Sequence, residues 1–539
     1  MPPAAPRSAP VHSTAAHSTA AHYTAAHYTA DYLRLKGQAE KGNANAQHSL
    51  GFMYFNGQGI EQSYALALHW YGLAAAQGLE HAQYNLGVMC QKGQGVAQDF
   101  VQAAHWYQQA AEQGYAAAQY NLGWLYAKGQ GLAQDSGQAM LWFSRAAEQG
   151  DAGAQNNLGM MYDNGKGVPQ DFVQAINWYR KAAEQGYARA QFNLGLHYDN
   201  GQGVRQDRQQ ATAWMRKAAE QGYAPAQFSL ALRYENGDVL PQDSGQAISW
   251  YRRAAGQGHA SSQFNLGLIY DNGQGVPCDK QAALAWYVKA AGQGHAAAQH
   301  NLGLHHEHGA QDYTRAQVFY RQAAGQGFPA AQYQLGLLHE HGQGMPADAQ
   351  EAIFWYRKAA DQGHVRAQFD LGLRYEHGQG VPQDLSLALE WYRRAAEQDY
   401  APAQYMQGVL HDRDDGPAPD SQQACACYCR AAAQGHSLAQ FALGLRHDNG
   451  QDVPQDYAAA WDWYALAARQ GHARAQLNLG LMAASGQGGP LDLQQAYIWL
   501  SMAVAAGVAG AEKSLRQTAA RMRETDLVRV REHLAAIAG

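Results

Sequence analysis

A segment of 36 residues is repeated along the 539-residue chain, and this repeat limits the folds that the sequence can adopt. A Leu-Gly pair or its equivalent marks each copy, and consecutive copies are 36 residues apart except for one step of 33. The thirteen marker positions are Gly51, Gly87, Gly123, Gly159, Gly195, Ala231, Gly267, Gly303, Gly336, Gly372, Gly408, Gly444 and Gly480. Such units bury apolar surface only against their neighbours, so the sequence predicts a solenoid rather than several globular domains.

Each copy contains the pattern of two helices, and the first of them is called helix A. In "ARAQFNLGLHYDNGQGVRQD", Ala190, Leu194 and Tyr198 are four residues apart, which is the spacing of one face of a helix. Gly195 lies beside this stripe and allows another backbone to approach closely. Helix A is expected to end at Asn200-Gly201, because glycine readily adopts the left-handed conformation that closes a helix.

The second helix, helix B, is predicted to begin at a residue that is Asp in twelve copies and Ser63 in the first. Both side chains accept hydrogen bonds from the free N–H groups of a first helical turn. Ala recurs four residues later in every copy, and Trp follows three residues after it, replaced only by Phe319 and Cys427. The small residue indicates a close helix crossing, and the Trp shares its stripe, so we predict that the Trp column is core rather than a binding platform.

The composition narrows the classes of function. A net charge of −6 with 16% charged residues predicts no nucleic-acid surface. No apolar run is long enough to span a bilayer, and the first thirty residues lack the apolar core of a secretory signal. The five cysteines do not recur at a fixed position in the repeats, which argues against a disulfide framework. We therefore expect a soluble, cytoplasmic protein with reduced thiols, and export stays open if the true start lies upstream.

The recurring pattern "AQ-NLG--Y--G-GV-QD---A--WY--AA-QG" resembles the Sel1-like repeat family, which is related to the tetratricopeptide repeats. The resemblance implies an all-α, right-handed superhelix of about thirteen 36-residue helix-turn-helix repeats in residues 31–511. Residues 1–30, rich in His, Ala and Thr, are predicted to be a disordered tail, and residues 512–539 a C-terminal helical cap.

The same resemblance implies a non-catalytic scaffold or adaptor that binds a partner protein or peptide, as relatives do in bacterial signalling. No cofactor is expected. Some exported relatives carry a cysteine pair in each repeat and have been linked to β-lactam binding or hydrolysis. This chain lacks those pairs, so a β-lactamase-like enzyme is kept only as an alternative.

A second alternative is a metal-binding protein, because His305, His306, Glu307 and His308 have the composition of a transition-metal site. In the aligned repeats, however, the histidines take packing and capping positions that Tyr or Asn holds elsewhere. Equivalent residues in stacked helices lie about 8 to 10 Å apart, too far to share one zinc ion. Only His305 with His308, or Cys425 with Cys429, could pair locally, and CxCxC is not a usual zinc spacing. We therefore predict no metal site.

The resemblance also places helix A on the inner, concave surface of the solenoid, where a partner would bind. Four positions of helix A would line it, those of Arg189, Phe192, Leu196 and Asp199. The second is aromatic in most copies, and the fourth is acidic in nine successive copies. The predicted partner-binding residues are Phe192, Phe228, Phe264, Phe369, Asp163, Asp199, Glu235, Asp271 and Glu307.

Two accounts of the acidic column stay open. A carboxylate in the last turn of a helix faces the negative end of the helix dipole, so something must compensate it. The acids either pair with helix-B arginines such as Arg180 and Arg216, or cap the turn themselves. Alternatively, they form the acidic edge of a groove with aromatic anchors that binds a peptide carrying Lys or Arg. We also expect the shorter repeat after Gly303 to lose residues from the turn after His308, with helix lengths unchanged.

Overall fold

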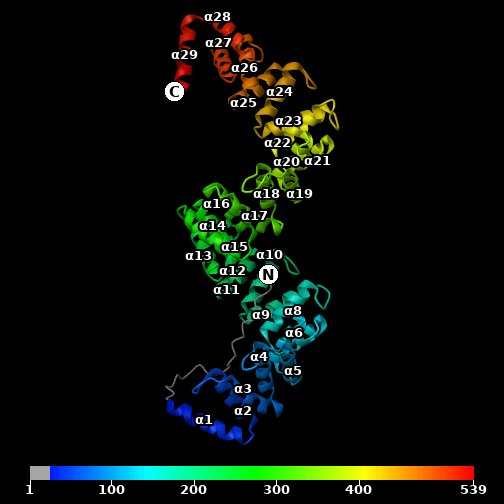
Figure 1. The fold of residues 1–539 in the computed structure, drawn as a ribbon, viewed down its shortest axis with the longest axis vertical. Coiled ribbons are helices and arrows are strands. Elements are labelled where there is room, and N and C mark those ends of the chain that lie inside the picture. Colours follow the sequence, from blue (N-terminus) through cyan, green and yellow to red (C-terminus); the bar gives the residue numbers. More distant parts are fainter. Residues whose placement is uncertain (1–24, 539) are drawn as a thin grey trace. The chain divides into compact units, whose positions relative to one another are not determined.

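The computed structural model describes residues 25–538, and this part of the chain contains helices α1 to α29 and no strand (Figure 1). The A helices are α2 (Ala44–Asn56), α4 (Glu80–Lys92), α6 (Ala116–Lys128), α8 (Ala152–Asn164), α10 (Ala188–Asn200), α12 (Ala224–Asn236), α14 (Ala260–Asn272), α16 (Ala296–Ala310), α18 (Pro329–His341), α20 (Val365–His377), α22 (Ala401–Asp412), α24 (Ser437–Asn449) and α26 (Ala473–Ser485). The B helices are α3 (Tyr64–Ala76), α5 (Phe100–Glu112), α7 (Ser136–Glu148), α9 (Phe172–Glu184), α11 (Arg208–Glu220), α13 (Ser244–Gly256), α15 (Lys280–Gly292), α17 (Tyr313–Gly325), α19 (Ala349–Asp361), α21 (Leu385–Ala396), α23 (Ser421–Ala433), α25 (Tyr457–Arg469) and α27 (Leu493–Ala505). The remaining helices are α1 (Ala25–Glu40), α28 (Ala511–Arg521) and α29 (Glu524–Ala538).

The helix ends follow from local side-chain chemistry. At the start of α5, Asp99 Oδ1 accepts hydrogen bonds from the N–H groups of Val101 (2.8 Å) and Gln102 (3.0 Å). At the end of α10, Gly201 has a φ of 68°, which is the left-handed conformation expected of a closing glycine. The predicted starts of the B helices and ends of the A helices are confirmed at these positions.

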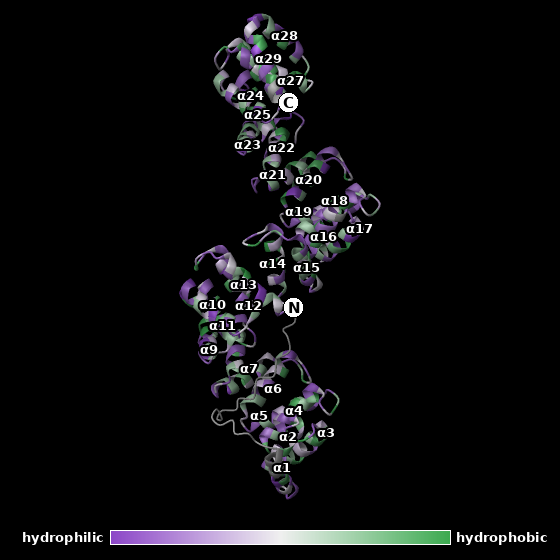
Figure 2. Cartoon of the chain, turned by 90° about the vertical axis from the view of Figure 1, so that its left-hand side faces the viewer, coloured by the Kyte–Doolittle hydropathy of each residue, from purple (hydrophilic) through white to green (hydrophobic). Residues whose placement is uncertain are grey.

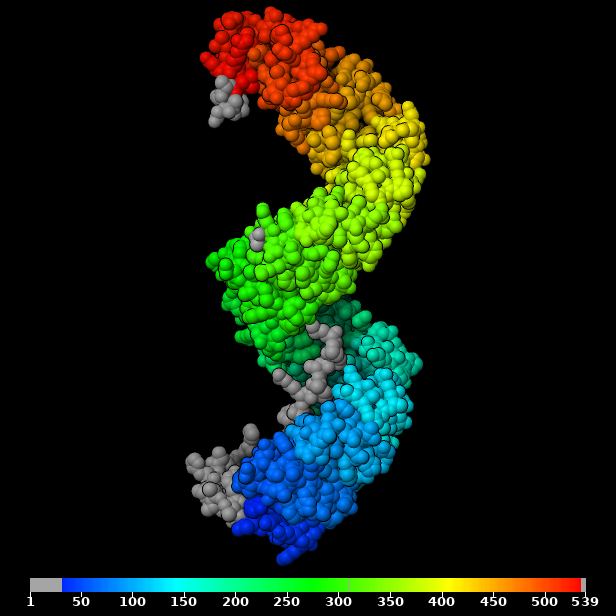
Figure 3. Space-filling model, in the orientation of Figure 1, coloured from blue at the N-terminus to red at the C-terminus, as the bar shows by residue number. Residues whose placement is uncertain are grey.

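Contacts divide the chain into two units, residues 1–262 and 263–539. Within each unit, each helix packs mainly against the helices before and after it in the chain. The colours in Figure 3 accordingly follow one another in sequence order within a unit. This arrangement confirms the predicted all-α solenoid of paired-helix repeats.

In ten repeats, the marker glycine lies against an aromatic ring from helix B. A Cβ atom added to Gly87 would lie only 2.6 Å from Cδ1 of Tyr107, whose side chain is fully buried. The same contact joins Gly336 to Tyr356, at 2.5 Å. The sequence predicted that another backbone would approach this glycine. The structure instead places a side chain of helix B closest to it, in most repeats the ring of the tyrosine that follows the Trp position, and most of these tyrosines are fully buried.

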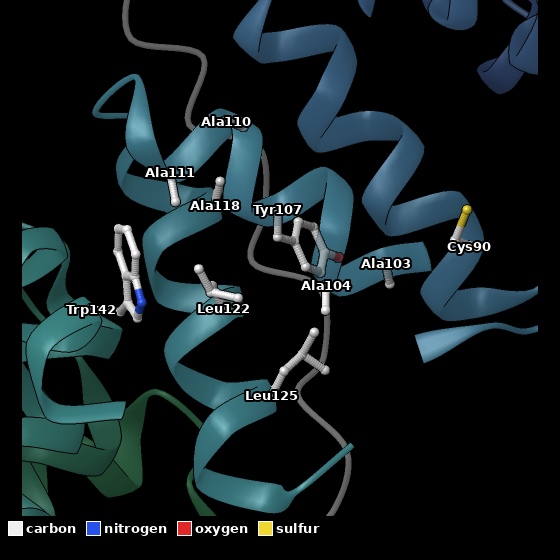
Figure 4. Close-up of a cluster of buried hydrophobic side chains, with 10 residues drawn as sticks. All are labelled: Cys90, Ala103, Ala104, Tyr107, Ala110, Ala111, Ala118, Leu122, Leu125 and Trp142. Atoms are coloured by element: carbon white, nitrogen blue, oxygen red, sulfur yellow. The ribbon is translucent and has the colours of Figure 1, made fainter. Parts of the chain in front are cut away.

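The Trp column joins successive repeats. Trp142 of α7 lies beside Ala111 of α5 and Leu122 of α6 and is only 6% exposed (Figure 4). Arg145 covers the ring, 4.6 Å from its centroid, and Lys181 covers Trp178 at 4.1 Å. These contacts support the core role predicted for the column.

A ladder of glutamine amides also connects the helices. The Gln119 amide donates from Nε2 to the carbonyl of Ala111 at the end of the preceding helix B (3.1 Å). Its Oε1 accepts from Nε2 of Gln149, at the end of its own helix B (2.8 Å). The Gln–Gln hydrogen bond recurs in twelve repeats. The hydrogen-bonding groups of these buried amides are thereby satisfied. This role of the glutamines was not predicted from the sequence.

The shorter repeat corrects one expectation. The missing residues come from the turn, as predicted, but helix α16 has 15 residues where most A helices have 13. Gly309 stays helical, and Gln311 takes the left-handed conformation with a φ of 53°. Without the longer turn, the chain extends the helix to reach Asp312, which caps α17.

The first and last helices lie outside the thirteen repeats. Helix α1 begins at Ala25, inside the segment predicted as a tail, and residues 1–24 lie outside the described residues. Helices α28 and α29 occupy the segment predicted as a cap, and Leu527 and Val530 are buried against Tyr497 of α27. Figure 2 shows hydrophilic and hydrophobic residues mixed along the helices, and no helix of the described chain is long and apolar enough to span a membrane.

Candidate protein-interaction surface

The solvent-exposed side of each helix A presents one stripe of residues, which we call the helix-A face. In α10 the stripe consists of Phe192, Leu196 and Asp199, spaced as neighbours on one side of a helix. Leu196 is 36% exposed, while Phe192 and Asp199 are half-buried. Ala190 and Leu194 lie on the opposite, buried side. The structure therefore brings the predicted aromatic and acidic residues of one helix onto the same face.

An apolar column runs through the middle of this face. Every repeat has an apolar residue one position after the marker glycine or its equivalent, and all of these side chains are half-buried or exposed. They are Phe52, Val88, Trp124, Met160, Leu196, Leu232, Leu268, Leu304, Leu337, Leu373, Val409, Leu445 and Leu481. Of these residues, only Leu196 was predicted from the sequence to line the surface. The signal for the whole column is an apolar residue that recurs in every copy outside the buried stripe.

The aromatic column flanks the apolar one. The ring of Phe264 stacks on His295, with centroids 4.8 Å apart, and tilts against Tyr287 at 5.9 Å. Phe228 has equivalent neighbours in Tyr251 and His259. The rings of Phe192 and Phe369 contact Tyr223 and Tyr400, respectively. Each predicted anchor is thus held on one side and half-exposed on the other, so its position is fixed before any partner binds.

The histidines beside these rings are helix caps. Nδ1 of His295 accepts a hydrogen bond from the N–H of Ala298 (3.3 Å), which requires an unprotonated nitrogen. Burial lowers the pKa of His295 and so favours that neutral form. The same capping bond is made by His364, His436 and His472.

The histidine-rich end of α16 also has structural partners. His306 stacks on Phe319, with centroids 5.5 Å apart and planes 7° from parallel. Glu307 accepts a hydrogen bond from the hydroxyl of Tyr320 (2.5 Å). Among the described residues, no group of three or more His, Cys, Asp or Glu side chains is placed to hold a metal ion.

The cysteines of α23 lie in a similar structural setting. Cys427 occupies the Trp position and is only 7% exposed, and burial raises the pKa of its thiol. Burial, and then the neighbouring Cys425, raise the pKa of Cys429. A thiol with a raised pKa is a weaker nucleophile and metal ligand at neutral pH, because the thiolate is the reactive form.

The acidic column is hydrogen-bonded to the tyrosines of helix B. Tyr251 donates to Glu235 (2.5 Å), and Tyr179 and Tyr287 donate to Asp163 and Asp271 (both 3.3 Å). Burial, followed by the charge of Asp163, raises the pKa of Tyr179 and keeps this donor protonated. In the repeat of Asp199, Met215 replaces the tyrosine.

A buried arginine or histidine from the following helix A is a further partner of several acids. Arg233 pairs with Asp199 at 2.7 Å, and Nε2 of His197 lies 3.3 Å from Asp163. Equivalent pairs join Arg374 to Glu340 and Arg446 to Asp412. Since these arginine and histidine side chains are almost fully buried, the acids join one repeat to the next.

At Arg180 and Arg216, the pairing of the acids with helix-B arginines that one account expected is not found. Arg180 donates to the hydroxyl of Tyr198 (3.4 Å), and Arg216 to that of Tyr234 (3.3 Å). These tyrosines lie on the buried side of helix A, three residues after the marker position, whereas the acids lie four residues after it and turn toward the helix-A face.

Comparison with known proteins places this fold in a family. A model of the Sel1 repeat matches thirteen consecutive segments, 44–79, 80–115, 116–151, 152–187, 188–223, 224–259, 260–295, 296–328, 329–364, 365–400, 401–436, 437–472 and 473–508. None of the curated proteins matches the chain.

Solved structures of Sel1 repeat proteins are also similar. A protective antigen of uropathogenic Escherichia coli is 31% identical, covers 93% of this chain and 92% of its own, and has a TM-score of 0.40. A Sel1 repeat protein from Oxalobacter formigenes is 34% identical over 45% of this chain and 96% of its own, with a TM-score of 0.43. An immunity protein from Pseudomonas aeruginosa is 21% identical over 40% of this chain and 81% of its own, with a TM-score of 0.28. Because the family model matches residues 44–508 without a gap, the chain belongs to the Sel1 repeat family.

Proposed function

We propose that this protein is a non-catalytic scaffold that binds a partner protein or peptide along its helix-A face. The apolar column supports this proposal, because it recurs in all thirteen repeats and stays partly exposed beside pre-positioned aromatic rings. Extended apolar surface on a soluble fold is typical of an interaction site. Sel1 repeat proteins are generally non-catalytic protein-interaction scaffolds, which agrees with this function.

The charge of the face determines what kind of contact dominates. The acidic column suggested a partner with basic residues. However, Tyr, Arg or His side chains already bind these carboxylates, so the carboxylates attract an incoming cation less strongly. Apolar and aromatic contacts should therefore supply most of the affinity, and a nucleic acid is not the expected partner. The five cysteines are free thiols, which supports a reducing compartment such as the cytoplasm.

A displayed library of random peptides, selected against the whole chain, tests this function. The test variant replaces Leu196, Leu232, Leu373 and Val409 of the apolar column by Lys. The matched control replaces Val101, Val173, Val288 and Val318 by Lys, because these valines are 50 to 61% exposed on B helices.

We expect the selected peptides to bind the test variant at least about tenfold more weakly and the control as tightly as the parent chain. Circular dichroism and thermal melting verify that both variants fold. Unchanged peptide affinity in a folded test variant would show that the helix-A face does not carry binding.

A further inference from the structure

One region of the helix-A face differs from the rest of that face in the residues that lie between neighbouring A helices. Two positions before the marker glycine or its equivalent, eleven repeats have a polar residue. These are Ser49, Asn85, Asn121, Asn157, Asn193, Ser229, Asn265, Asn301, Gln334, Asp370 and Asn478. The two exceptions are consecutive, Met406 in α22 and Ala442 in α24.

Several of the polar residues at this position bond to the preceding helix A. Asn193 Nδ2 donates to Oδ1 of Asn156 (3.1 Å), and Asn85 Nδ2 lies 3.0 Å from Nε2 of His48. The Tyr333 hydroxyl donates to Asp370 across the same boundary (2.8 Å). Where such bonds form, the boundary between two A helices is polar.

Met406 and Ala442 replace these polar groups by apolar ones, and both are half-buried. Around them, three successive A helices present apolar or aromatic side chains that are half-buried or exposed, including Leu438 at 43% exposure. We call this set the α20–α24 patch, and it consists of Phe369, Leu373, Tyr405, Met406, Val409, Leu438, Phe441, Ala442 and Leu445. It extends across two helix boundaries that lack the polar residue found at this position in the other repeats.

Charges at the edges of the patch are asymmetric. At the C-terminal ends of the helices, Glu376 accepts from Tyr392 (2.6 Å), and Asp412 accepts from Tyr428 (3.4 Å) and pairs with Arg446. At the N-terminal ends, Arg366 of α20 and Arg474 of α26 are exposed. A partner would therefore meet carboxylates that are already engaged at one edge and exposed guanidinium groups at the other.

We propose that the α20–α24 patch binds an amphipathic α-helix of a partner protein, with acidic residues on the flank that faces Arg366 and Arg474. This inference rests on the proposed scaffold function and specifies its site and partner class. The hydrogen-bonding needs of the partner's backbone favour a helix over an extended segment. An extended segment over Met406 and Ala442 would bury N–H and C=O groups with no side-chain partner, at a cost of about 1 to 3 kcal/mol each.

A helix satisfies its own backbone and presents apolar side chains every three to four residues. The exposed arginines then favour acidic residues on the flank of that helix, since opposite charges at the rim of an interface speed association.

The experiment selects binders to the whole chain from two displayed libraries. One holds a rigid helical scaffold with a randomised face, and the other holds unstructured peptides flanked by prolines. Fluorescence anisotropy then gives the Kd of each selected binder for the parent, for Met406→Asn with Ala442→Asn, and for Ser229→Asn. The last variant is the matched control, because it places an amide at the same repeat position in another region. A further variant, Arg366→Glu with Arg474→Glu, tests the charged edge.

We expect the helical library to supply the tighter binders, enriched in Asp and Glu on one flank. Met406→Asn with Ala442→Asn should weaken their binding about tenfold, the arginine variant should weaken it severalfold, and Ser229→Asn should leave it unchanged. Tighter binders from the extended library, or equal affinity in the folded double-Asn variant, would overturn the proposal.

The two proposals fail in different ways. If binders retain their affinity for the double-Asn variant but lose it in the four-Lys variant of the apolar column, only the α20–α24 patch is wrong. If they retain it in both variants, or if neither library yields a binder, the scaffold function itself fails.

Discussion

The repeats at residues 188–223 and 401–436 both form a pair of packed helices, but they differ in the residues that close helix A and that pack between repeats. In the first, Gly201 closes helix A in the left-handed conformation and Trp214 stands at the inter-repeat position. In the second, helix α22 ends one residue earlier, at Asp412, followed by Arg413 in an extended conformation, and Cys427 replaces the Trp. Both keep the Gln–Gln hydrogen bond and an apolar side chain on the marker glycine. The comparison indicates that these two contacts define the fold, whereas the turn and the Trp adjust its stability.

The largest effect should come from breaking the contact that both repeats share. A Cβ at Gly408 would lie 2.8 Å from the ring of Tyr428, and one at Gly195 would lie 2.9 Å from Cγ of Met215. Gly408→Val should lower the free energy of unfolding by about 3 kcal/mol, and Gly195→Val by less, because Met adapts its shape more easily than a ring. Gly292→Val is the control, since nothing lies within 4 Å of that glycine. Equal, small losses for all three in urea unfolding would contradict this account.

A second change should make the regular repeat resemble the irregular one. Trp214→Cys removes a half-buried ring that packs between repeats, so we expect a loss of about 2 kcal/mol. Hydrogen exchange should show α22 and α23 as less protected than α10 and α11 in the parent, with the difference reduced in the variant. Similar protection of both repeats in the parent would mean that Cys427 costs no local stability.

Acidification should destabilise the repeats capped by His more than the repeats with Tyr at the same position. Burial lowers the pKa of His295, His364, His436 and His472 below their unfolded value, and desolvation is the largest cause in each case. The unfolded chain therefore binds protons first, and stability present above about pH 6.5 declines as the pH falls through that value toward the folded pKa.

The melting temperature of the unit formed by residues 263–539 should thus fall between pH 7 and pH 5. Replacing the four histidines by Asn keeps a capping oxygen and should remove that part of the pH dependence. A pH response that survives these substitutions would assign it to another group in the same unit, such as His300, whose pKa is also lowered by burial.

The smallest effect concerns the turn after helix B. Asp399 has a φ of 57°, where Gly186 of a regular repeat has 89°. Asp399→Gly should therefore stabilise the chain by up to about 1 kcal/mol, and Gly186→Asp should destabilise it by a similar amount. Thermal melting of the two reciprocal variants measures both signs. A loss of stability in Asp399→Gly would show that the Asp side chain contributes more than its backbone strain costs.

The sequence predicted the repeat, the helix pairs and their caps because these depend on local chemistry. Asp99 and Gly201 act through bonds within a few residues, so their patterns are readable without the fold. The burial of Tyr107 and the partners of Asp199 depend on how two helices rotate about their axes. Trp and Tyr are adjacent in the sequence and both large, so periodicity alone did not show which of them faces the glycine.

The same division between local and long-range chemistry applies to the residues of the helix-A face. Phe192, Phe228, Phe264 and Phe369 do lie half-exposed on helix A. The acidic residues share the face, but their tyrosine and arginine partners come from other helices, which a spacing rule within one helix cannot supply. The α20–α24 patch was readable in principle, because Met406 and Ala442 interrupt a column of polar residues.

The glutamine ladder has a consequence for how such a chain can change its length. Gln47 bonds to the carbonyl of Ala39 in α1 as Gln83 bonds to that of Ala75 in α3, so the lone first helix offers the same connection as a complete helix B. Within each unit, every junction presents the same donor and the same acceptor to its neighbour. Gene duplication or loss of one 36-residue segment would therefore rejoin matching ends without requiring a new interface. A chain built this way can acquire or discard repeats in evolution while each junction keeps its hydrogen bonds.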